Sequence, residues 1–282
     1  MISFFRAFWR LIAYCVLTPL CMLVQALALV LHLPFQRGFP MWYHRQTCRI
    51  MGLKPEVRGE ISAARPTLFV SNHVSYLDIE VLGSLIRGSF VAKAEVRRWP
   101  IFGWLARLQR SVFVDRRAGR TLKSRDEMGT RLEDGDSLIL FPEGTTSDGN
   151  RILPFKSALF SVAKQRPRGQ PLTVQAVSIA YAKLDGLPMG RYLRPYLAWY
   201  GAMELGGHFL RVFGLGTVTV VVEFHPPVTI DQLGDRKALA AYCHAQVTRG
   251  VAEALTGRPQ AALPPPAGRE PAPSLAARAG QA

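Results

Sequence analysis

Two short apolar runs, each followed at once by a polar cluster, most constrain how this chain can fold. The run at 67–70 leads into a segment that carries His73 and Asp78, and the run at 137–141 leads into a turn that begins at Glu143. In α/β proteins, polar side chains gather where parallel strands end. The sequence therefore predicts that both clusters meet at one edge of a sheet.

Strand-like and helix-like runs alternate after the first 55 residues, which is typical of α/β architecture. Strands are expected near 67–71, 89–92, 111–114, 137–141, 172–180 and 217–224. Helices are expected near 77–86, 103–108, 120–133, 157–164 and 236–255. We predict a membrane anchor and interfacial helix over 1–55, one α/β domain with a central sheet flanked by helices over 56–257, and a disordered tail rich in proline and alanine over 258–282.

His73 and Asp78 stand five residues apart, which allows contact if His73 ends a strand and Asp78 lies in the first turn of the next helix. The carboxylate would then fix the imidazole tautomer and stabilise the imidazolium that forms when His73 accepts a proton. This is part of a serine-protease triad without its serine, and it suits a reaction in which a substrate hydroxyl attacks directly. The alternative is a structural histidine beside a helix-capping aspartate.

Three motifs in order resemble the glycerolipid acyltransferase family, whose bacterial archetype is 1-acylglycerol-3-phosphate acyltransferase. They are Asn72-His73 with Asp78, then Phe113-Val114-Asp115-Arg116, then Phe141-Pro142-Glu143-Gly144-Thr145. The resemblance runs from about Arg65 to Phe224, and the motifs are specific only in combination.

The resemblance implies a catalytic pair, His73 and Asp78, and a set of substrate-binding residues. His73 would deprotonate the hydroxyl of a lysolipid, whose oxygen attacks an acyl thioester of acyl carrier protein or coenzyme A. Neither a metal nor another cofactor is expected. The oxyanion needs donors, most simply backbone N–H groups near His73 or Gly144. Glu143 contacts the acceptor or pins the turn, and both interpretations stay open. The implied substrate-binding residues are Asn72, Lys93, Arg116, Glu143, Gly144, Thr145 and Thr146.

The sequence departs from the phosphatidate-forming relatives at Thr146. Those relatives carry arginine there, and a hydroxyl cannot replace the bidentate phosphate contacts of a guanidinium. Residues 174–179 also lack the proline of the usual strand. These departures resemble the bacterial subgroup that acylates lyso-ornithine lipid, some of whose members also make phosphatidate. A strict 1-acylglycerol-3-phosphate acyltransferase is the alternative, and drift in a core strand is the structural interpretation.

The net charge of +15, with a pI near 10.3, requires an acidic partner. The exposed aromatics that accompany basic residues in nucleic-acid modules are missing, so no nucleic acid is expected. Arginines instead flank apolar stretches, as at Arg10, Arg37 and Arg110. This pattern favours anionic membrane lipids, although part of the charge could serve the acidic acyl donor.

The run from Leu11 to Leu33 contains no Asp, Glu, Lys or Arg and is long enough to span a bilayer. Pro19 interrupts it, and basic residues flank both ends, so the positive-inside rule gives no orientation. Because acyl thioesters are cytosolic, we expect a bent helical hairpin or re-entrant anchor in a bacterial inner membrane, with the catalytic domain facing the cytoplasm. A cleaved signal peptide is disfavoured because the apolar run continues past 26–28.

Two further features leave alternatives open. Four cysteines without metal-type spacing favour a reduced compartment. Residues 185–213 fit no clean period, and they either line an acyl groove or form a loop packed on the core. A thioesterase or a non-catalytic lipid-binding scaffold are the rival functions. A scaffold has no need of His73 with Asp78, and a thioesterase gains nothing from Lys93 and Arg116.

Overall fold

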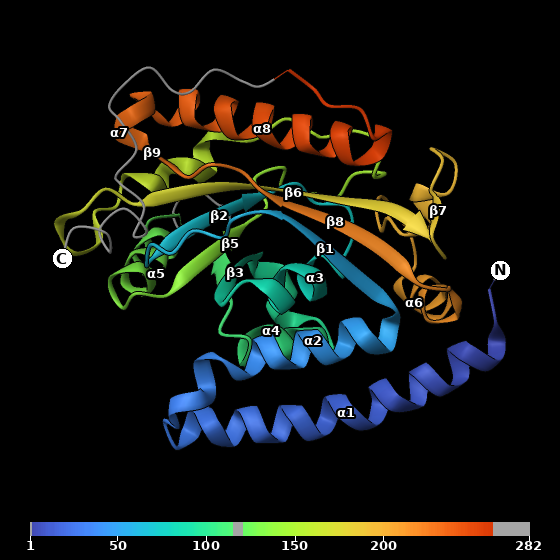
Figure 1. Cartoon of the computed structure of the whole chain (residues 1–282). Coiled ribbons are helices and arrows are strands. Elements are labelled where there is room, and N and C mark those ends of the chain that lie inside the picture. Colours follow the sequence, from blue (N-terminus) through green and yellow to red (C-terminus); the bar gives the residue numbers. More distant parts are fainter. Residues whose placement is uncertain (1, 115–120, 262–282) are drawn as a thin grey trace, which may run out of the picture.

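The computed structural model describes residues 2–114 and 121–261. They form a mixed α/β fold in which a nine-stranded sheet carries helices on both faces (Figure 1). The predicted fold class is confirmed. Arg116 lies outside the described residues, and so does the predicted tail from residue 262 onward.

The sheet has the strand order β1-β8-β6-β2-β5-β3-β4, with two short strands, β7 and β9, paired to β6. Neighbours are parallel except where β6 runs antiparallel to β7, β8 and β9. The strands are β1 (Leu53–Gly59), β2 (Thr67–Ser71), β3 (Gly88–Lys93), β4 (Val112–Val114), β5 (Ser137–Leu140), β6 (Thr173–Leu184), β7 (Leu187–Pro188), β8 (Val218–Phe224) and β9 (Val228–Thr229).

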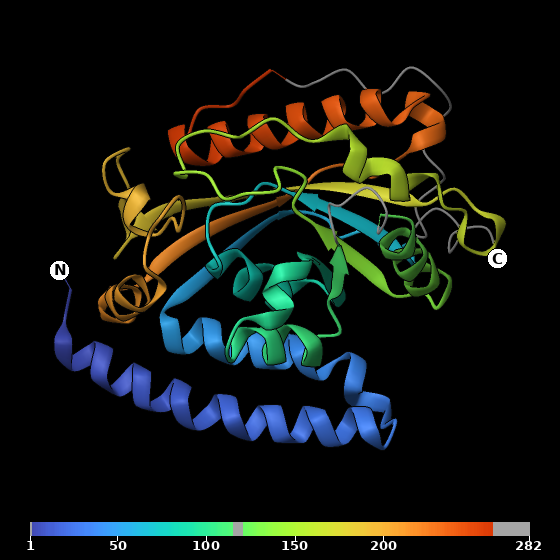
Figure 2. The same cartoon turned by 180° about the vertical axis from the view of Figure 1, so that it is seen from behind.

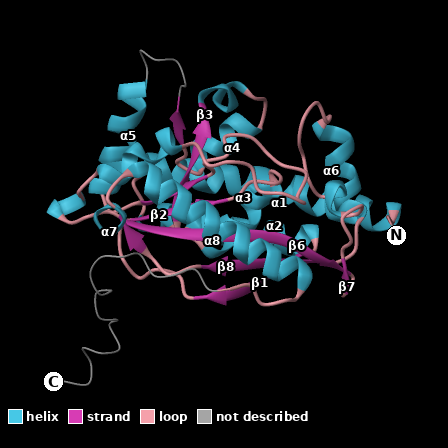
Figure 3. Ribbon diagram, turned by 90° about the horizontal axis from the view of Figure 1, so that it is seen from above, coloured by secondary structure: helices cyan, strands magenta, loops and turns pink. Residues whose placement is uncertain are grey.

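Helices cover the two faces of the sheet unequally, as Figure 2 shows from behind. The helix α8 (Arg236–Thr256) lies over β6 on one face, together with the 3-10 helix η3 (Ser157–Lys164) (Figure 3). On the other face lie α2 (Phe39–Met51), α3 (Leu77–Leu85) and α4 (Phe102–Leu108), with α1 (Phe4–Val30) outermost. The remaining helices are α5 (Thr121–Glu133), α6 (Leu205–Gly214) and α7 (Ile230–Leu233).

Two apolar cores, one on each face, hold these layers together. Strand β2 is buried along its whole length and contributes Phe69 to one core and Leu68 and Val70 to the other. Successive side chains of a strand point to opposite faces, so a strand buried on both sides is apolar throughout. This explains why β2 reads as a continuous apolar run rather than an alternating one.

The first helix, α1, is one continuous helix through Pro19, followed by a turn and the shorter α2. Its buried residues are polar or small, among them Thr18, Gln25 and Ala28, whereas leucines such as Leu23 and Leu27 are exposed on its outer side. This distribution is the reverse of that of an ordinary surface helix. Among the described residues α1 is the one helix long and apolar enough to cross a membrane.

Three polar side chains, Arg10, Thr18 and Gln25, attach α1 to the rest of the protein. The Arg10 guanidinium donates to the backbone oxygens of Met51, Phe213 and Leu215, at 3.2, 3.3 and 2.7 Å. Arg10 was expected among the cations that attract lipid headgroups, but it is used inside the fold. Gln25 Nε2 donates to the carbonyl oxygens of Gln36 and Leu108, and the hydroxyl groups of Thr18 and Tyr43 lie 3.1 Å apart.

The sequence missed several elements, of which β1 and α6 matter most here, and it gave one helix the wrong type. Strand β1 contains lysine, proline and glutamate, yet it pairs in parallel with β8 along its length. The predicted boundary between residues 55 and 56 therefore falls within a strand of the sheet. Helix α6 was not predicted within 185–213. The segment expected to be an α-helix at 157–164 is the 3-10 helix η3.

Candidate functional site

His73 and Asp78 meet at the carboxyl end of β2, as their spacing predicted. His73 Nδ1 lies 2.8 Å from Asp78 Oδ2. The backbone N–H groups of Val74 and Ser75 donate to the same oxygen at 2.6 and 2.9 Å, and the Tyr181 hydroxyl donates to Oδ1 at 2.7 Å. Four donors thus satisfy a side chain that is fully buried. Asp78 is not a helix cap, because its bonds converge on the loop before α3.

This arrangement fixes both the tautomer and the orientation of the imidazole. Because a carboxylate only accepts, Nδ1 carries the proton and donates, which leaves Nε2 free to accept one. The ring also stacks on Phe141, with centroids 4.0 Å apart and planes inclined by 14°. The His73 side chain is 19% exposed while Asp78 is closed off, so one edge of the imidazole reaches a substrate. A positioned histidine of this kind can act as a general base.

Tyr181 is part of this cluster, and sequence reasoning missed it. Burial, the nearby charge of Asp78 and the hydrogen bond to that carboxylate hold the pKa of Tyr181 well above its ordinary value. The phenol therefore stays a neutral donor that fixes Asp78 from the side opposite to His73. No motif surrounds Tyr181, since it belongs to β6 and comes close only through the pairing of β6 with β2.

Glu143 connects the two predicted polar clusters through backbone contacts, and it does not line the cavity. Its Oε1 accepts from the backbone N–H of His73 at 2.9 Å, and its Oε2 accepts from that of Leu153 at 3.2 Å. The side chain is 1% exposed, and burial raises its pKa to about 7 against these two hydrogen bonds, which lower it. Of the two interpretations left open by the sequence, these contacts favour the structural one.

Asn72 is also enclosed by backbone. Its amide donates to the carbonyl oxygen of Ile179 at 3.0 Å and accepts from the N–H of the same residue at 2.9 Å. Both ends of the fully buried amide are therefore used to join β2 to β6. These contacts favour a structural role over the predicted contact with substrate.

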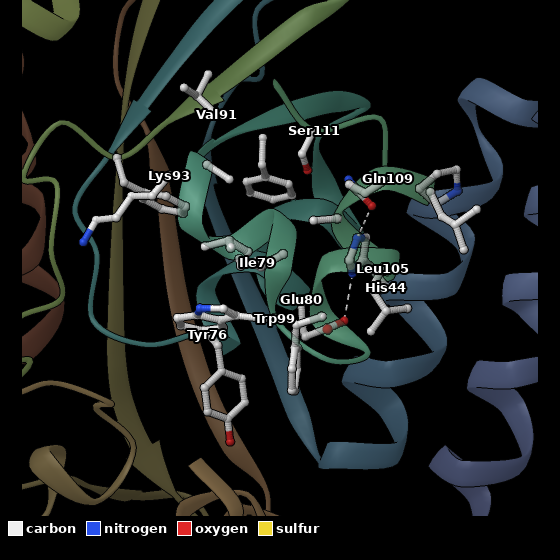
Figure 4. A pocket seen from close by; sticks show the side chains of 18 of the residues that line it. His44, Tyr76, Ile79, Glu80, Val91, Lys93, Trp99, Leu105, Gln109 and Ser111 are labelled. Atoms are coloured by element: carbon white, nitrogen blue, oxygen red, sulfur yellow. Dashed lines mark hydrogen bonds and ion pairs between the residues drawn. The ribbon is translucent and has the colours of Figure 1, made fainter. Parts of the chain in front are cut away.

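A cavity of about 440 Å³ opens beside His73 and brings together most of the other predicted site residues. Lys93 reaches it from the end of β3, and Gly144, Thr145 and Thr146 line it from the turn after β5. The cavity continues beneath α1, α2 and α4, where apolar side chains such as Leu105 form its walls (Figure 4). Trp199 and Tyr200, from the segment of uncertain period, also line it. The segment 185–213 therefore contributes to the cavity wall, and α6 begins within it at Leu205.

A buried polar group lies in the wall of this cavity, across from Lys93 in Figure 4. His44 Nδ1 is 2.8 Å from Glu80 Oε2 and His44 Nε2 is 2.6 Å from Gln109 Oε1. Thr47 donates to the same oxygen of Glu80. Burial lowers the pKa of His44, but the charge of Glu80 and the two hydrogen bonds outweigh it, and the pKa is raised. Nothing in the sequence pointed to this group.

The turn after β5 supplies backbone donors next to Gly144, one of the two places named by the prediction. The N–H groups of His73 and Gly144 are occupied, because they donate to Glu143 and to the Phe141 carbonyl oxygen at 3.1 Å. Within residues 2–114 and 121–261, the N–H groups of Thr145 and Thr146 make no hydrogen bond. Gly144 has φ +69°, a conformation that glycine adopts without strain. Both free N–H groups belong to residues that line the cavity beside His73.

Two predictions remain, the substrate contact of Arg116 and the expectation that no metal is needed. Arg116 lies outside the described residues, although the residue pair Lys93 and Val114 joins the ends of β3 and β4 just before it. Within the described part of the chain, no group of three or more His, Cys, Asp or Glu side chains could hold a metal ion.

Comparisons of the sequence with known proteins agree with this geometry. The family model described as Acyltransferase matches residues 54–181. A lyso-ornithine lipid O-acyltransferase of Rhizobium meliloti is 42% identical over 95% of this chain and 94% of its own. A 1-acyl-sn-glycerol-3-phosphate acyltransferase of Neisseria gonorrhoeae is 31% identical over 61% of this chain and 64% of its own.

The structure is similar to one solved by crystallography. The 1-acyl-sn-glycerophosphate acyltransferase PlsC from Thermotoga maritima superimposes with a TM-score of 0.58. The match covers 86% of this chain and 97% of the other, at 24% sequence identity. At 24% identity, this similarity supports the same fold and no more.

Proposed function

The chain belongs to the acyltransferase family, and we propose that it moves a fatty acyl chain from an acyl thioester to the free hydroxyl of a lysolipid in membrane lipid biosynthesis. The observation that carries this proposal is the His73 imidazole, oriented by a buried carboxylate, with Nε2 directed to a largely apolar cavity. That arrangement provides a base for a hydroxyl and a place for an acyl chain, and in the described part of the chain no serine, threonine or cysteine side chain hydrogen-bonds to His73.

The reaction follows from the contacts of His73. Its Nε2 accepts the proton of the lysolipid hydroxyl while the oxygen attacks the thioester carbonyl carbon. Asp78 stabilises the imidazolium that results, and Tyr181 and two backbone N–H groups keep the carboxylate in place. When the tetrahedral intermediate collapses, the C–S bond breaks and the imidazolium returns the proton to the thiolate. No cofactor takes part in this scheme.

The Thr145 and Thr146 N–H groups are our candidates for stabilising the oxyanion. Backbone donors that are already fixed and lack a partner can bind developing negative charge with little reorganisation. In this scheme Glu143 acts through the backbone. By binding the N–H groups of His73 and Leu153, it holds the base and the donor turn at a constant separation.

We assign the acceptor as lyso-ornithine lipid and/or 1-acylglycerol-3-phosphate. The support is the 42% identity to a lyso-ornithine lipid O-acyltransferase, together with Thr146 at the position where phosphatidate-forming relatives carry arginine. Lys93 and Arg116 would contact the anionic part of either acceptor. A strict 1-acylglycerol-3-phosphate acyltransferase is the alternative, supported by the relative from Neisseria.

The donor is an acyl carrier protein or coenzyme A thioester, and the enzyme works at the cytoplasmic face of a bacterial inner membrane. The exposed apolar side of α1 supports an anchor that lies in one leaflet beside α2. Pinned by Arg10 and Gln25, α1 also forms part of the cavity wall through Thr18 and Met22. The acyl chain would therefore enter from the bilayer side. Anionic lipids are the surface partner.

The reaction class is tested by replacing the base. We expect His73→Ala to lower acyl transfer by about a hundredfold to ten-thousandfold, the usual contribution of a general base. The assay follows thiol release from an acyl thioester by membranes with and without lysolipid. The control is His32→Ala, since His32 is exposed and does not line the cavity. Near-normal activity of His73→Ala would contradict the mechanism, and acceptor-independent thiol release would favour a thioesterase.

The acceptor is tested at Thr146. We expect native protein to acylate lyso-ornithine lipid at least as well as lysophosphatidate, and Thr146→Arg to shift the preference toward lysophosphatidate by about ten- to a hundredfold, because a charge-assisted hydrogen bond is gained. The measurement is a competition between the two acceptors, given as a ratio of kcat/KM. Native selectivity for lysophosphatidate that Thr146→Arg leaves unchanged would favour the strict alternative.

A further inference from the structure

A second cavity, of about 330 Å³, lies at the edge of the sheet opposite the His73 site. Its walls come from the amino ends of strands. Arg65 precedes β2, Arg87 precedes β3 and Asp136 precedes β5. At the other ends of the same strands, His73 follows β2, Lys93 is the last residue of β3 and Glu143 follows β5. His73 and the arginines that precede β2 and β3 are therefore at opposite ends of the strands, and the second cavity has no role in the proposed reaction.

Four arginines line this second cavity, with a single carboxylate. They are Arg37, Arg65, Arg87 and Arg110, and the carboxylate is Asp136. Asp136 already binds Arg110 at 2.7 Å, and it also lies 3.6 Å from Arg37 and 3.7 Å from Arg131. One negative charge is thus shared by three guanidinium groups, and the cavity keeps an excess of positive charge.

Arg65 and Arg87 carry most of that excess. In the part of the chain that the structure describes, neither guanidinium makes a hydrogen bond or an ion pair, although both line the cavity. Both residues are exposed, and the planar, forked guanidinium matches the oxygens of a phosphate. The chemistry of the cavity therefore suits a phosphate-bearing ligand.

The position of the cavity selects a lipid over a soluble phosphate. Pro40 and Gln109 line both this cavity and the apolar one, so the two share a wall. Arg37 and Gln36 come from the turn between α1 and α2. Exposed aromatic side chains lie nearby in the chain, Phe35 in the same turn and Trp42 in α2. A phosphate held in the cavity would thus have exposed apolar surface beside it for acyl chains.

We propose that this arginine cavity binds the phosphate of an anionic phospholipid of the bilayer, which is neither acceptor nor product. The bound head group neutralises Arg65 and Arg87 and holds the turn between α1 and α2 against the membrane surface. The site goes beyond the acyl transfer proposed above, because it lies at the other edge of the sheet. It also differs from a diffuse basic surface, because it is a pocket with defined donors.

The test uses the full chain in uncharged detergent and titrates it calorimetrically with three probes. They are dihexanoyl-phosphatidylglycerol, dihexanoyl-phosphatidylcholine and inorganic phosphate. We expect the first to bind with saturation and the other two to bind at least about tenfold more weakly, because one lacks the net charge and the other lacks the chains. Arg65→Gln/Arg87→Gln should weaken binding of the first probe by about tenfold or more.

Three further variants keep the outcome interpretable. Arg236→Gln/Lys237→Gln removes the same charge from the exposed start of α8 and should change binding by less than about twofold. Arg65→Lys/Arg87→Lys keeps the charge but loses the fork, and it should bind with intermediate affinity. Lys93→Gln reports any binding at the catalytic cavity. Unfolding temperatures confirm that each variant is folded.

The results separate this site from the proposed function. Equal weakening by the α8 variant, or a loss confined to Lys93→Gln, would overturn the arginine site while leaving acyl transfer untouched. Inorganic phosphate that bound as tightly as the lipid would contradict the lipid assignment. Conversely, the arginine cavity would stand even if His73→Ala kept its activity, because the titration needs no turnover.

Discussion

At the scale of single residues, Glu143 is the side chain whose charge depends most on the fold. Burial raises its pKa from 4.5 to about 7. A carboxyl group whose pKa is higher in the folded chain contributes stability that is fully present below pH 4.5 and is lost as the pH rises through about 7. The full difference corresponds to roughly 3 kcal/mol, at about 1.4 kcal/mol for each pKa unit.

We therefore expect the wild type to lose stability relative to Glu143→Gln as the pH rises from 4.5 to 7, because glutamine stays neutral. The measurement is the unfolding temperature of both proteins in detergent across this range. Glu204→Gln serves as the control, since Glu204 is exposed and caps α6 without a side-chain bond. A constant difference between wild type and Glu143→Gln would contradict this prediction, because it would show that folding leaves the pKa of Glu143 unchanged.

The sequence predicted individual contacts well where they are local. The five-residue spacing correctly predicted that His73 and Asp78 touch, because a strand end and a first helical turn lie close together. It did not predict what occupies Asn72 or what supports Asp78. Those partners, Ile179 and Tyr181, belong to a strand about a hundred residues further on. Long-range partners of this kind follow from strand pairing, which a single sequence does not reveal.

At the scale of elements, the sequence predicted the buried parallel strands but not the strand at the edge of the sheet. Strands β2 and β5 are apolar on both faces and carry a signal of their own. Strand β1 lies at the edge, with Lys54, Pro55 and Glu56, and only its pairing with β8 identifies it. Pro19, where an interruption was expected, does not end α1, which runs as a single helix and contacts α2, α4 and α6.

The packing of α3 on α2 leads to a prediction about Gly83. A methyl group at this buried helical glycine would overlap the ring of His44. Gly83→Ala should therefore displace His44 from Glu80 and Gln109, and we expect it to lower the free energy of unfolding by about 1–3 kcal/mol. Thermal unfolding in detergent measures the effect.

Gly207→Ala in α6 is the matched control, because nothing surrounds that glycine. The control should be neutral or stabilise the protein by up to about 1 kcal/mol through its helix propensity. If Gly83→Ala were equally harmless, then His44 would have room to move, and the polar contacts of its ring with Glu80 and Gln109 would not define the cavity wall.

At the scale of the whole molecule, the two faces of the sheet have different surroundings. One face carries α8, and the other carries α2 to α4 beneath α1, whose outer side exposes large apolar residues. The net charge of +15 predicted an anionic surface as partner, and the apolar run predicted an anchor. How the two combine could not be read from the sequence, since it depends on which side of α1 packs inward.

These features predict that two forces hold the full chain on anionic vesicles, and that salt separates them. Charge attraction between basic residues and lipid is screened at about 1 M salt, where the Debye length is about 3 Å. Burial of the outer leucines of α1 is not screened, and each contributes about 1.5–3 kcal/mol. We therefore expect wild type to sediment with vesicles at both low and high salt.

Leu20→Glu/Leu23→Glu should sediment at low salt but be released at about 1 M salt, with a partition coefficient lowered by about tenfold or more. Both leucines are exposed on α1, so folding should be unaffected. Ala241→Glu/Thr248→Glu places the same charges on exposed positions of α8 and should behave as wild type at high salt. Release of wild type at about 1 M salt would indicate that charge attraction alone holds the protein on the vesicles, and release of the α8 variant would show that the effect of the substitutions is not specific to α1. Retention of both variants at high salt would mean that α1 contacts the bilayer through another side.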